Sequence, residues 1–200
     1  MRSAMRRALL ATALILVPSL AFAHPGLPGH THGFVDGVMH PLTGLDHLLA
    51  MVAVGLFAAQ LGGRALWAVP ASFVTMMATA GFAGMNGIAL PLTETGIALS
   101  VIALGGVIAL RASMPLAAAM AMVGFFAIFH GYAHGIETPD NASGLLFGLG
   151  FVAATALLHG IGMAIGLTIG RIQGAYGRNL VRVAGSAAAV IGVAMLAGAV

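Results

Sequence analysis

Six apolar stretches, each close to the length that crosses a bilayer, constrain this chain more than any other feature. They cover residues 45–62, 65–85, 94–111, 115–134, 143–170 and 180–199. A membrane-spanning helix needs about 20 predominantly apolar residues, and short segments rich in Gly, Pro, Ser and Asn separate these stretches. Only 6% of the residues are charged, against about 25% in soluble domains. The sequence therefore predicts an all-α membrane protein, a compact bundle of six transmembrane helices.

Glycine is abundant inside these stretches, often at four-residue intervals. Examples are Gly144/Gly148 and Gly162/Gly166/Gly170. Small residues at this spacing let helix backbones approach closely where lipid is as apolar as the side chains. We therefore expect these glycines to mark helix–helix contacts.

The first 23 residues have the features of a secretory signal. Three arginines within the first seven residues precede the apolar run 8–17, and the small-x-small triplet Ala21-Phe22-Ala23 follows. This pattern is typical of a cleaved signal, and the short apolar core argues against an uncleaved first helix. We expect a signal peptide at 1–23, a periplasmic histidine-containing N-terminal segment at 24–44 and a six-helix transmembrane domain at 45–200.

The remaining charges indicate how the bundle sits in the membrane. Five arginines fall after the first, third and fifth stretches: Arg64, Arg111, Arg171, Arg178 and Arg182. The five acids fall at or near the opposite side: Asp36, Asp46, Glu94, Glu137 and Asp140. By the positive-inside rule, the arginine side is cytoplasmic, which agrees with a signal that delivers the mature N-terminus to the periplasm. We expect a multi-pass protein of the bacterial inner membrane, with lipid and not nucleic acid around it.

Histidines within apolar stretches suggest metal chemistry, because imidazole is costly in hydrocarbon unless it has a partner. His130, His134 and Glu137 stand at i, i+4 and i+7, on one stripe of a helix. Two imidazoles four residues apart can share one divalent ion, and a carboxylate one turn on balances its charge. The alternative is that both histidines hydrogen-bond to neighbouring helices. With no cysteine in the chain, thiolate sites are excluded.

A second cluster precedes the first long stretch. Pro41 suits the first position of a helix, which places His40 at its cap and His47 about 10 Å deeper. That distance is too large for one ion if the helix is regular, since metal–nitrogen distances are about 2 Å. Either Gly44 marks an unwound stretch that folds His40 back, or these residues are successive stations on a path. Asp46 is either a ligand or the group that orients a ligand imidazole.

Other polar residues have two interpretations each. His159, in the middle of 143–170, is a ligand on the path or an interhelical hydrogen-bonding group. Glu94 is a favourable acid at a helix N-terminus or part of an external funnel. The segment with His24, His30 and His32 either captures an ion loosely or is a plain tail. The predicted metal-handling set is His40, Asp46, His47, His130, His134, Glu137, Glu94 and His159.

Two motifs together resemble one known family. The runs His40-Pro41-x-x-Gly44-x-Asp46-His47 and His130-Gly131-x-Ala133-His134-Gly135-x-Glu137 are similar to those of the HupE/UreJ family, membrane proteins associated with hydrogenase and urease maturation and regarded as nickel permeases. The resemblance extends over essentially the whole mature chain. It implies nickel uptake, with cobalt as the alternative ion. The metal-handling positions it implies are His40, Asp46, His47, His134 and Glu137, with His130 and Glu94 beside them.

The expected function is therefore import of Ni²⁺ or Co²⁺ from periplasm to cytoplasm, for hydrogenase or urease maturation. The ion is cargo and no cofactor is permanently bound, with metallochaperones as downstream partners. No Walker-type loop is present, so ATP is not the direct driver. A divalent cation that enters across a potential of about 100 mV, negative inside, gains roughly 4.6 kcal/mol. Capture should weaken below about pH 6.5, because ligand imidazoles must be unprotonated.

A rival from another class is an intramembrane zinc hydrolase, in which histidines hold zinc and a carboxylate activates water. Such a site needs a fixed ligand set around one open position. Here the candidates are spread over several depths of the membrane, which suits a path better. We therefore expect no enzyme activity and no catalytic residues.

Overall fold

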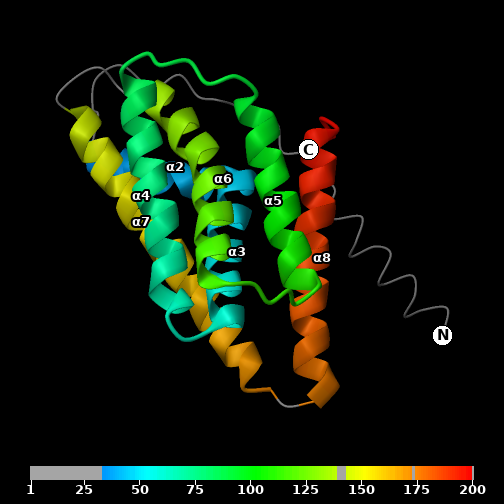
Figure 1. The fold of residues 1–200 in the computed structure, drawn as a ribbon. Coiled ribbons are helices and arrows are strands. Elements are labelled where there is room, and N and C mark those ends of the chain that lie inside the picture. The colour runs from blue at the N-terminus through cyan, green and yellow to red at the C-terminus, as the bar shows by residue number, and fades with distance from the viewer. Residues whose placement is uncertain (1–32, 139–142, 173, 200) are drawn as a thin grey trace, which may run out of the picture. The chain divides into compact units, whose positions relative to one another are not determined.

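The computed structural model describes residues 33–138, 143–172 and 174–199, which form helices joined by short connections (Figure 1). The signal peptide, residues 24–32 of the N-terminal segment with His24, His30 and His32, and Asp140 lie outside the described residues. The described helices are α2 (Gly33–Thr43), α3 (Leu45–Leu61), α4 (Ala65–Met85), α5 (Thr93–Ala109), α6 (Leu116–Glu137), α7 (Ser143–Gly170) and α8 (Gly174–Leu196). The all-helical class is confirmed, and each of the six apolar stretches corresponds to one of α3 to α8.

The helices differ in whether they can cross a membrane alone. Four of them, α4, α6, α7 and α8, are long and apolar enough to do so. Helices α2 and α3 pass the same test only together, as a pair bent by 85° that has the form of a broken span or of a re-entrant loop, and α5 is a shorter apolar helix. The described chain is thus a multi-pass membrane protein with four such helices, or five spans with the broken pair. The prediction of six complete spans is not confirmed.

Helix α2 corrects the interpretation of Pro41. Residues 33–43 were expected to belong to an extramembrane segment, with Pro41 beginning the next helix. Instead, Pro41 lies in the last turn of α2, where its missing N–H removes one helical hydrogen bond and helps end the helix. Gly44 then has an extended backbone, with φ −90° and ψ 118°, and α3 begins at Leu45.

Close backbone contacts at glycines hold the helix pairs together. A Cβ at Gly37 or at Gly150 would collide with backbone atoms where α2 crosses α7, and a Cβ at Gly55 would collide with the His159 carbonyl where α3 crosses α7. Gly131 meets the backbone of α4 in the same way. Small residues thus take the role expected of them in membrane helix packing.

The glycines named from spacing alone are only partly those that pack. Gly162 and Gly166 lie against α3, so the prediction holds for them. Gly148 and Gly170 have nothing within 4 Å of an added Cβ, and the prediction was wrong there. Four-residue spacing identifies a face of the helix, but it does not say how far a neighbour extends along that face.

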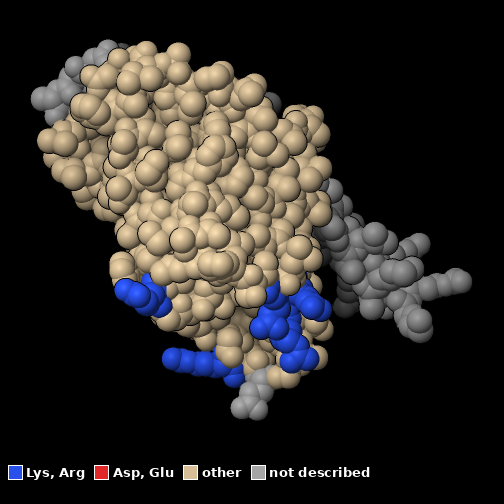
Figure 2. Space-filling model, in the orientation of Figure 1, with Lys and Arg blue, Asp and Glu red and all other residues tan. Residues whose placement is uncertain are grey.

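The charged residues separate by end of the bundle. The α3–α4, α5–α6 and α7–α8 connections lie at one end, and the arginines gather there (Figure 2). The acids on described residues are near the other ends of the same helices: Asp36 and Asp46 where α2 and α3 begin, Glu94 in the first turn of α5 and Glu137 at the end of α6. This separation of charge agrees with the pattern from which the sidedness was predicted.

Candidate metal-binding site

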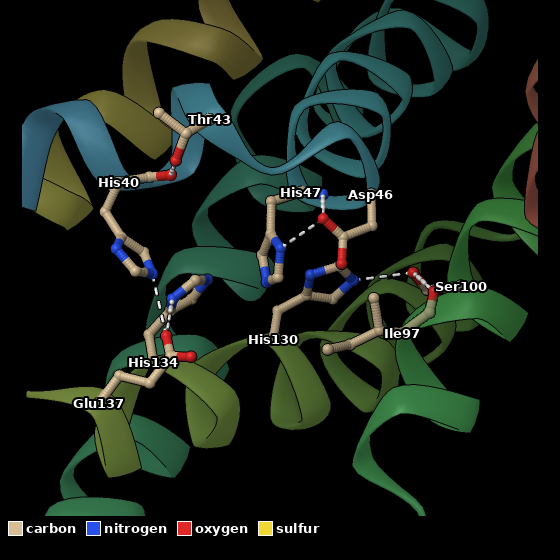
Figure 3. Close-up of polar contacts among 9 residues, drawn as sticks. All are labelled: His40, Thr43, Asp46, His47, Ile97, Ser100, His130, His134 and Glu137. Carbon is tan, nitrogen blue, oxygen red and sulfur yellow. Dashed lines mark hydrogen bonds and ion pairs between the residues drawn. The ribbon is translucent and has the colours of Figure 1, made fainter. Parts of the chain in front are cut away.

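The break at Gly44 brings the two histidine motifs together. His40 is in the last turn of α2 and His47 in the first turn of α3, and both face the end of α6 (Figure 3). The ring centroid of His134, on α6, lies 4.7 Å from that of His40 and 4.1 Å from that of His47. The sequence left open whether Gly44 is an unwound point that folds His40 back toward His47. In the structure Gly44 is such a point, and His40 and His47 both contact His134.

His40, His134 and Glu137 form a compact set, which we call the triad. His40 Nε2 lies 2.9 Å from Glu137 Oε2, and His134 Nδ1 lies 3.5 Å from the same oxygen. One ligand atom from each residue can be chosen so that all three lie within 4.8 Å of one another. Since metal–ligand bonds are about 2 Å long, donors on one ion stand at most about 4 Å apart. A small inward movement of the triad would therefore hold a cation.

Asp46 orients the imidazole of His47. Its Oδ1 accepts a hydrogen bond from the His47 backbone N–H at 2.8 Å and another from His47 Nδ1 at 2.9 Å. Because a carboxylate only accepts, Nδ1 carries the proton and Nε2 keeps a lone pair. That Nε2 is buried and has no hydrogen-bond partner. The contact is the one by which a carboxylate orients a metal-binding histidine, so the geometry favours this role for Asp46 over direct ligation.

Ser100 of α5 does the same for His130. The Ser100 hydroxyl donates its proton to the Ile97 carbonyl at 2.6 Å, and its oxygen lies 2.8 Å from His130 Nε2. A hydroxyl has a single proton, so it accepts from His130 Nε2–H, and His130 Nδ1 is left with a lone pair. This Nδ1 is also buried without a partner. Two buried imidazoles, those of His47 and His130, are thus each held with an unprotonated nitrogen that has no hydrogen-bond partner.

The four imidazoles form a row rather than one shell. Figure 3 shows His40, His134, His47 and His130 in that order, and the His47 and His130 centroids are 4.7 Å apart. The ring of His47 contacts both His130 and His134. The spacing of His130 and His134 predicted that they share one ion, whereas in the structure His130 turns to Ser100 and His134 to the triad.

Two of the predicted residues stand apart from this row. His159 on α7 is buried with both nitrogens unpaired, and its contact is with Phe73, whose ring also contacts His130. Glu94 is exposed in the first turn of α5 and joins none of the hydrogen bonds or ion pairs of the described residues. His159 therefore neighbours the row through Phe73, and Glu94 is separate.

A comparison with protein families matches residues 12–195 to the family described as HupE / UreJ protein. The chain belongs to the HupE/UreJ family. Protein HupE of Rhizobium leguminosarum bv. viciae is 48% identical over 186 residues, which cover 93% of this chain and 95% of that protein. No solved structure matches the chain. The family membership that the two histidine motifs suggested is thus confirmed.

This HupE/UreJ protein has site residues that the motifs did not reveal. Ser100 was missed, although a serine in the middle of an apolar stretch is a recognisable signal. Phe151 on α7 lies against His134, with centroids 4.0 Å apart, and Phe147 lies 5.5 Å from the His40 centroid. No sequence signal separates these aromatic residues from ordinary core residues, because only the crossing of α2 and α7 places them beside the row.

The electrostatics of the row suit a cation. Asp46 and Glu137 supply two carboxylates, while all the arginines of the described residues belong to the connections, or the start of α8, at the other end of the bundle. The triad is open at its edge, with 35% of the His40 side chain and 54% of the Glu137 side chain exposed. The inner histidines are enclosed. The row therefore runs from the exposed carboxylate of Glu137 to the buried nitrogen lone pairs of His47 and His130.

Proposed function

We propose that this protein imports a divalent transition-metal ion across the membrane, with Ni²⁺ as the cargo and Co²⁺ as the alternative. The observation that carries the proposal is the row of four imidazoles inside a multi-pass membrane protein. In this row the free nitrogens of His47 and His130 are kept as lone pairs by Asp46 and Ser100. Buried polar atoms normally have partners, so these unpaired nitrogens point to a guest with positive charge.

Capture begins at the triad. Glu137 is the more exposed member and attracts the hydrated cation, and His40 beside it supplies the first imidazole. Imidazole suits nickel, cobalt, copper and zinc alike, so preference among them depends on geometry and supply. His134 then replaces further water molecules, because it lies next to His40 on the buried side.

Transfer continues along the row. The contact between His134 and His47 places the next lone pair beside the occupied site, and His130 follows it. His159 lies beyond Phe73 and offers two unpaired nitrogens for the next step inward. A path of several weak stations lets an ion enter and also leave, as conduction requires.

The proposed direction and setting complete the function. The triad faces the periplasm and the arginine end the cytoplasm of a bacterial inner membrane, so the membrane potential draws the cation inward. The released ion passes to cytoplasmic metallochaperones for hydrogenase or urease maturation, the setting associated with the HupE/UreJ family. No ATP is consumed directly and no cofactor is required.

The hydrolase alternative receives less support from this geometry. Two imidazoles and a carboxylate, as in the triad, do occur in catalytic zinc sites. Hydrolysis also needs a second group that activates the water, and the other carboxylate, Asp46, is bonded to His47. Glu137 cannot serve both as ligand and as base at once.

Uptake of labelled nickel by cells that lack other nickel importers tests the proposal. We expect Glu137→Gln and His134→Ala to lower uptake to the background of cells without the protein, at matched membrane expression. Glu94→Gln is the control, since it removes an exposed carboxylate with no contact to the row. Uptake equal to wild type in both site variants would refute the proposal, and competition by cobalt, zinc and copper would rank the ions.

A further inference from the structure

Two hollows at the arginine end of the bundle are not explained by metal handling. The larger, of about 660 Å³, lies between the end of α3 and the α5–α6 connection, with Arg64 and Arg111 in its wall. The smaller, of about 170 Å³, lies among α3, α7 and α8, with Arg111 and Arg178 in its wall. Arg111 and Gln60 line both. The two hollows therefore meet at one arginine and one amide.

Arg111 has a backbone conformation that is unfavourable for any residue except glycine. Its φ is +51°, in the left-handed region that glycine usually occupies at the end of a helix. Its N–H bonds to the Ile108 carbonyl, and the next N–H, of Ala112, bonds to Val107, the pattern of a Schellman turn. Glycine would form this turn without the strain. An observed outlier of this kind is a reason to look for a role of the side chain.

Gln60 contributes a buried acceptor without a partner. Its Nε2 donates to the carbonyls of Val107 and Ala112, at 3.3 and 2.9 Å, so the amide is oriented by the same turn. Its Oε1 is buried and has no hydrogen-bond partner. An acceptor left unpaired in this way costs free energy unless a guest donates to it. A hydroxyl group on the guest would do so.

Within the described part of the chain, the arginines around the hollows are not paired with an acid. None of the ion pairs of the described residues involves Arg64, Arg111 or Arg178, and the described acids lie at the opposite end. Guanidinium groups bind phosphate oxygens well, often through two hydrogen bonds. Basic pockets between helices on one membrane surface are known sites for anionic lipid headgroups.

From these observations we propose that the hollows at Arg111 and Gln60 bind a phosphate ester that carries a hydroxyl group, of the phosphoglycerol type. The phosphate lies between Arg111 and its neighbours Arg64 and Arg178, and the hydroxyl donates to Gln60 Oε1. Apolar side chains of α3, α7 and α8, among them Leu56 and Ile169, line the smaller hollow. They favour a lipid as the source of the ester over a free phosphate, because they can receive the start of an acyl chain.

The single tryptophan lies close in sequence to Arg64 and Ala65, which line the larger hollow, and serves as the probe. Trp67 is in the first turn of α4, three residues after Arg64, and is 63% exposed. The protein is placed in phosphatidylcholine vesicles with a small fraction of brominated phosphatidylglycerol, and quenching of Trp67 is compared with that by the same fraction of brominated phosphatidylcholine. We expect stronger quenching by the phosphatidylglycerol. Equal quenching by the two lipids would overturn the proposal.

Arg111→Gly separates binding from folding. Glycine relieves the left-handed backbone, so the Tm should stay the same or rise, while the preference for phosphatidylglycerol should fall about tenfold, because the charge-assisted hydrogen bonds from Arg111 to the phosphate are lost. Arg171→Ala is the matched control, since it removes an equal charge from the same end but does not line either hollow. Equal losses in both variants would indicate a diffuse charge effect and refute the site.

Added glycerol 3-phosphate distinguishes the two sources of the ester. If it abolishes the extra quenching in the wild type, the site accepts the free ester. If the extra quenching persists, the lipid with its acyl chains is the ligand. In both cases the comparison is restricted to the extra quenching that is lost in Arg111→Gly, because only that part is due to the site.

Discussion

Two buried histidines of the row, His47 and His130, each depend on one polar neighbour for the tautomer they adopt. Asp46 keeps the proton of His47 on Nδ1, and Ser100 keeps that of His130 on Nε2. The free nitrogen then faces the row without a partner. A neutral imidazole has one donor and one acceptor nitrogen, so losing the neighbour lets the acceptor move to the wrong side. The neighbours therefore matter nearly as much as the ligands.

We expect Ser100→Ala to raise the nickel concentration for half-maximal uptake about tenfold, the usual effect of removing a group that orients a ligand histidine. Ser72→Ala is the matched control, because the Ser72 hydroxyl also bonds to a backbone carbonyl, that of Met120, but does not contact a histidine. Concentration-dependent uptake of labelled nickel gives both values. The same shift in the two serine variants would mean that Ser100 acts only through packing.

Asp46→Asn should have a similar effect on His47. An asparagine can present its NH₂ group to Nδ1 and so favour the wrong tautomer, and we expect nickel affinity to fall about 10- to 100-fold. Asp36→Asn serves as the comparison, since Asp36 is exposed in the first turn of α2. Isothermal titration of purified protein with nickel measures the affinities. Wild-type affinity in Asp46→Asn would exclude the orienting role.

At the scale of elements, apolar length predicted α3 to α8 within a few residues at most ends, but it did not predict α2. The reason is that α2 is stabilised where it crosses α7, through Gly37 and Gly150, and tertiary contacts of this kind leave no local signal. The residues of both motifs were identified from spacing and residue type. Their grouping into a triad and an inner pair depends on the 85° bend at Gly44, which the sequence offered only as one of two alternatives.

The crossing of α2 and α7 can be tested with two glycines on one helix. A Cβ at Gly150 collides with the Phe34 carbonyl, whereas a Cβ at Gly148 meets nothing within 4 Å. We expect Gly150→Ala to push α2 and His40 away from Glu137 and to destabilise the protein by about 1–3 kcal/mol. Gly148→Ala should be neutral or slightly stabilising, because alanine favours the helix.

Nickel uptake and thermal unfolding in detergent measure the two effects in these variants. In Gly150→Ala we expect uptake to fall even in those preparations that remain folded, because His40 has left the triad. Normal uptake in folded Gly150→Ala protein would show that the position of α2 does not matter for capture.

At the scale of the whole molecule, charge is divided between the two ends while the apolar helices lie between them. Figure 2 shows the arginines gathered at one end, whereas Asp46 lies in the first turn of α3, and His134 and Glu137 lie in the last turn of α6, away from the arginine-bearing connections. A cation captured at the triad thus starts at the anionic end, and the histidines that follow in the row, His47 and His130, are held by Asp46 and Ser100. For the import proposed above, we therefore expect the membrane potential to supply the free energy.

Purified protein in proteoliposomes can test this energy source directly, with a potassium gradient and an ionophore that set the potential. At about 100 mV, negative inside, a divalent ion should accumulate roughly 10³-fold, whereas at zero potential the inner and outer concentrations should become equal. Vesicles with His134→Ala protein control for leakage, because the variant keeps the bundle but loses a central imidazole of the row. Accumulation that persists at zero potential would require coupling to another gradient, and a proton gradient imposed in the same vesicles would identify it.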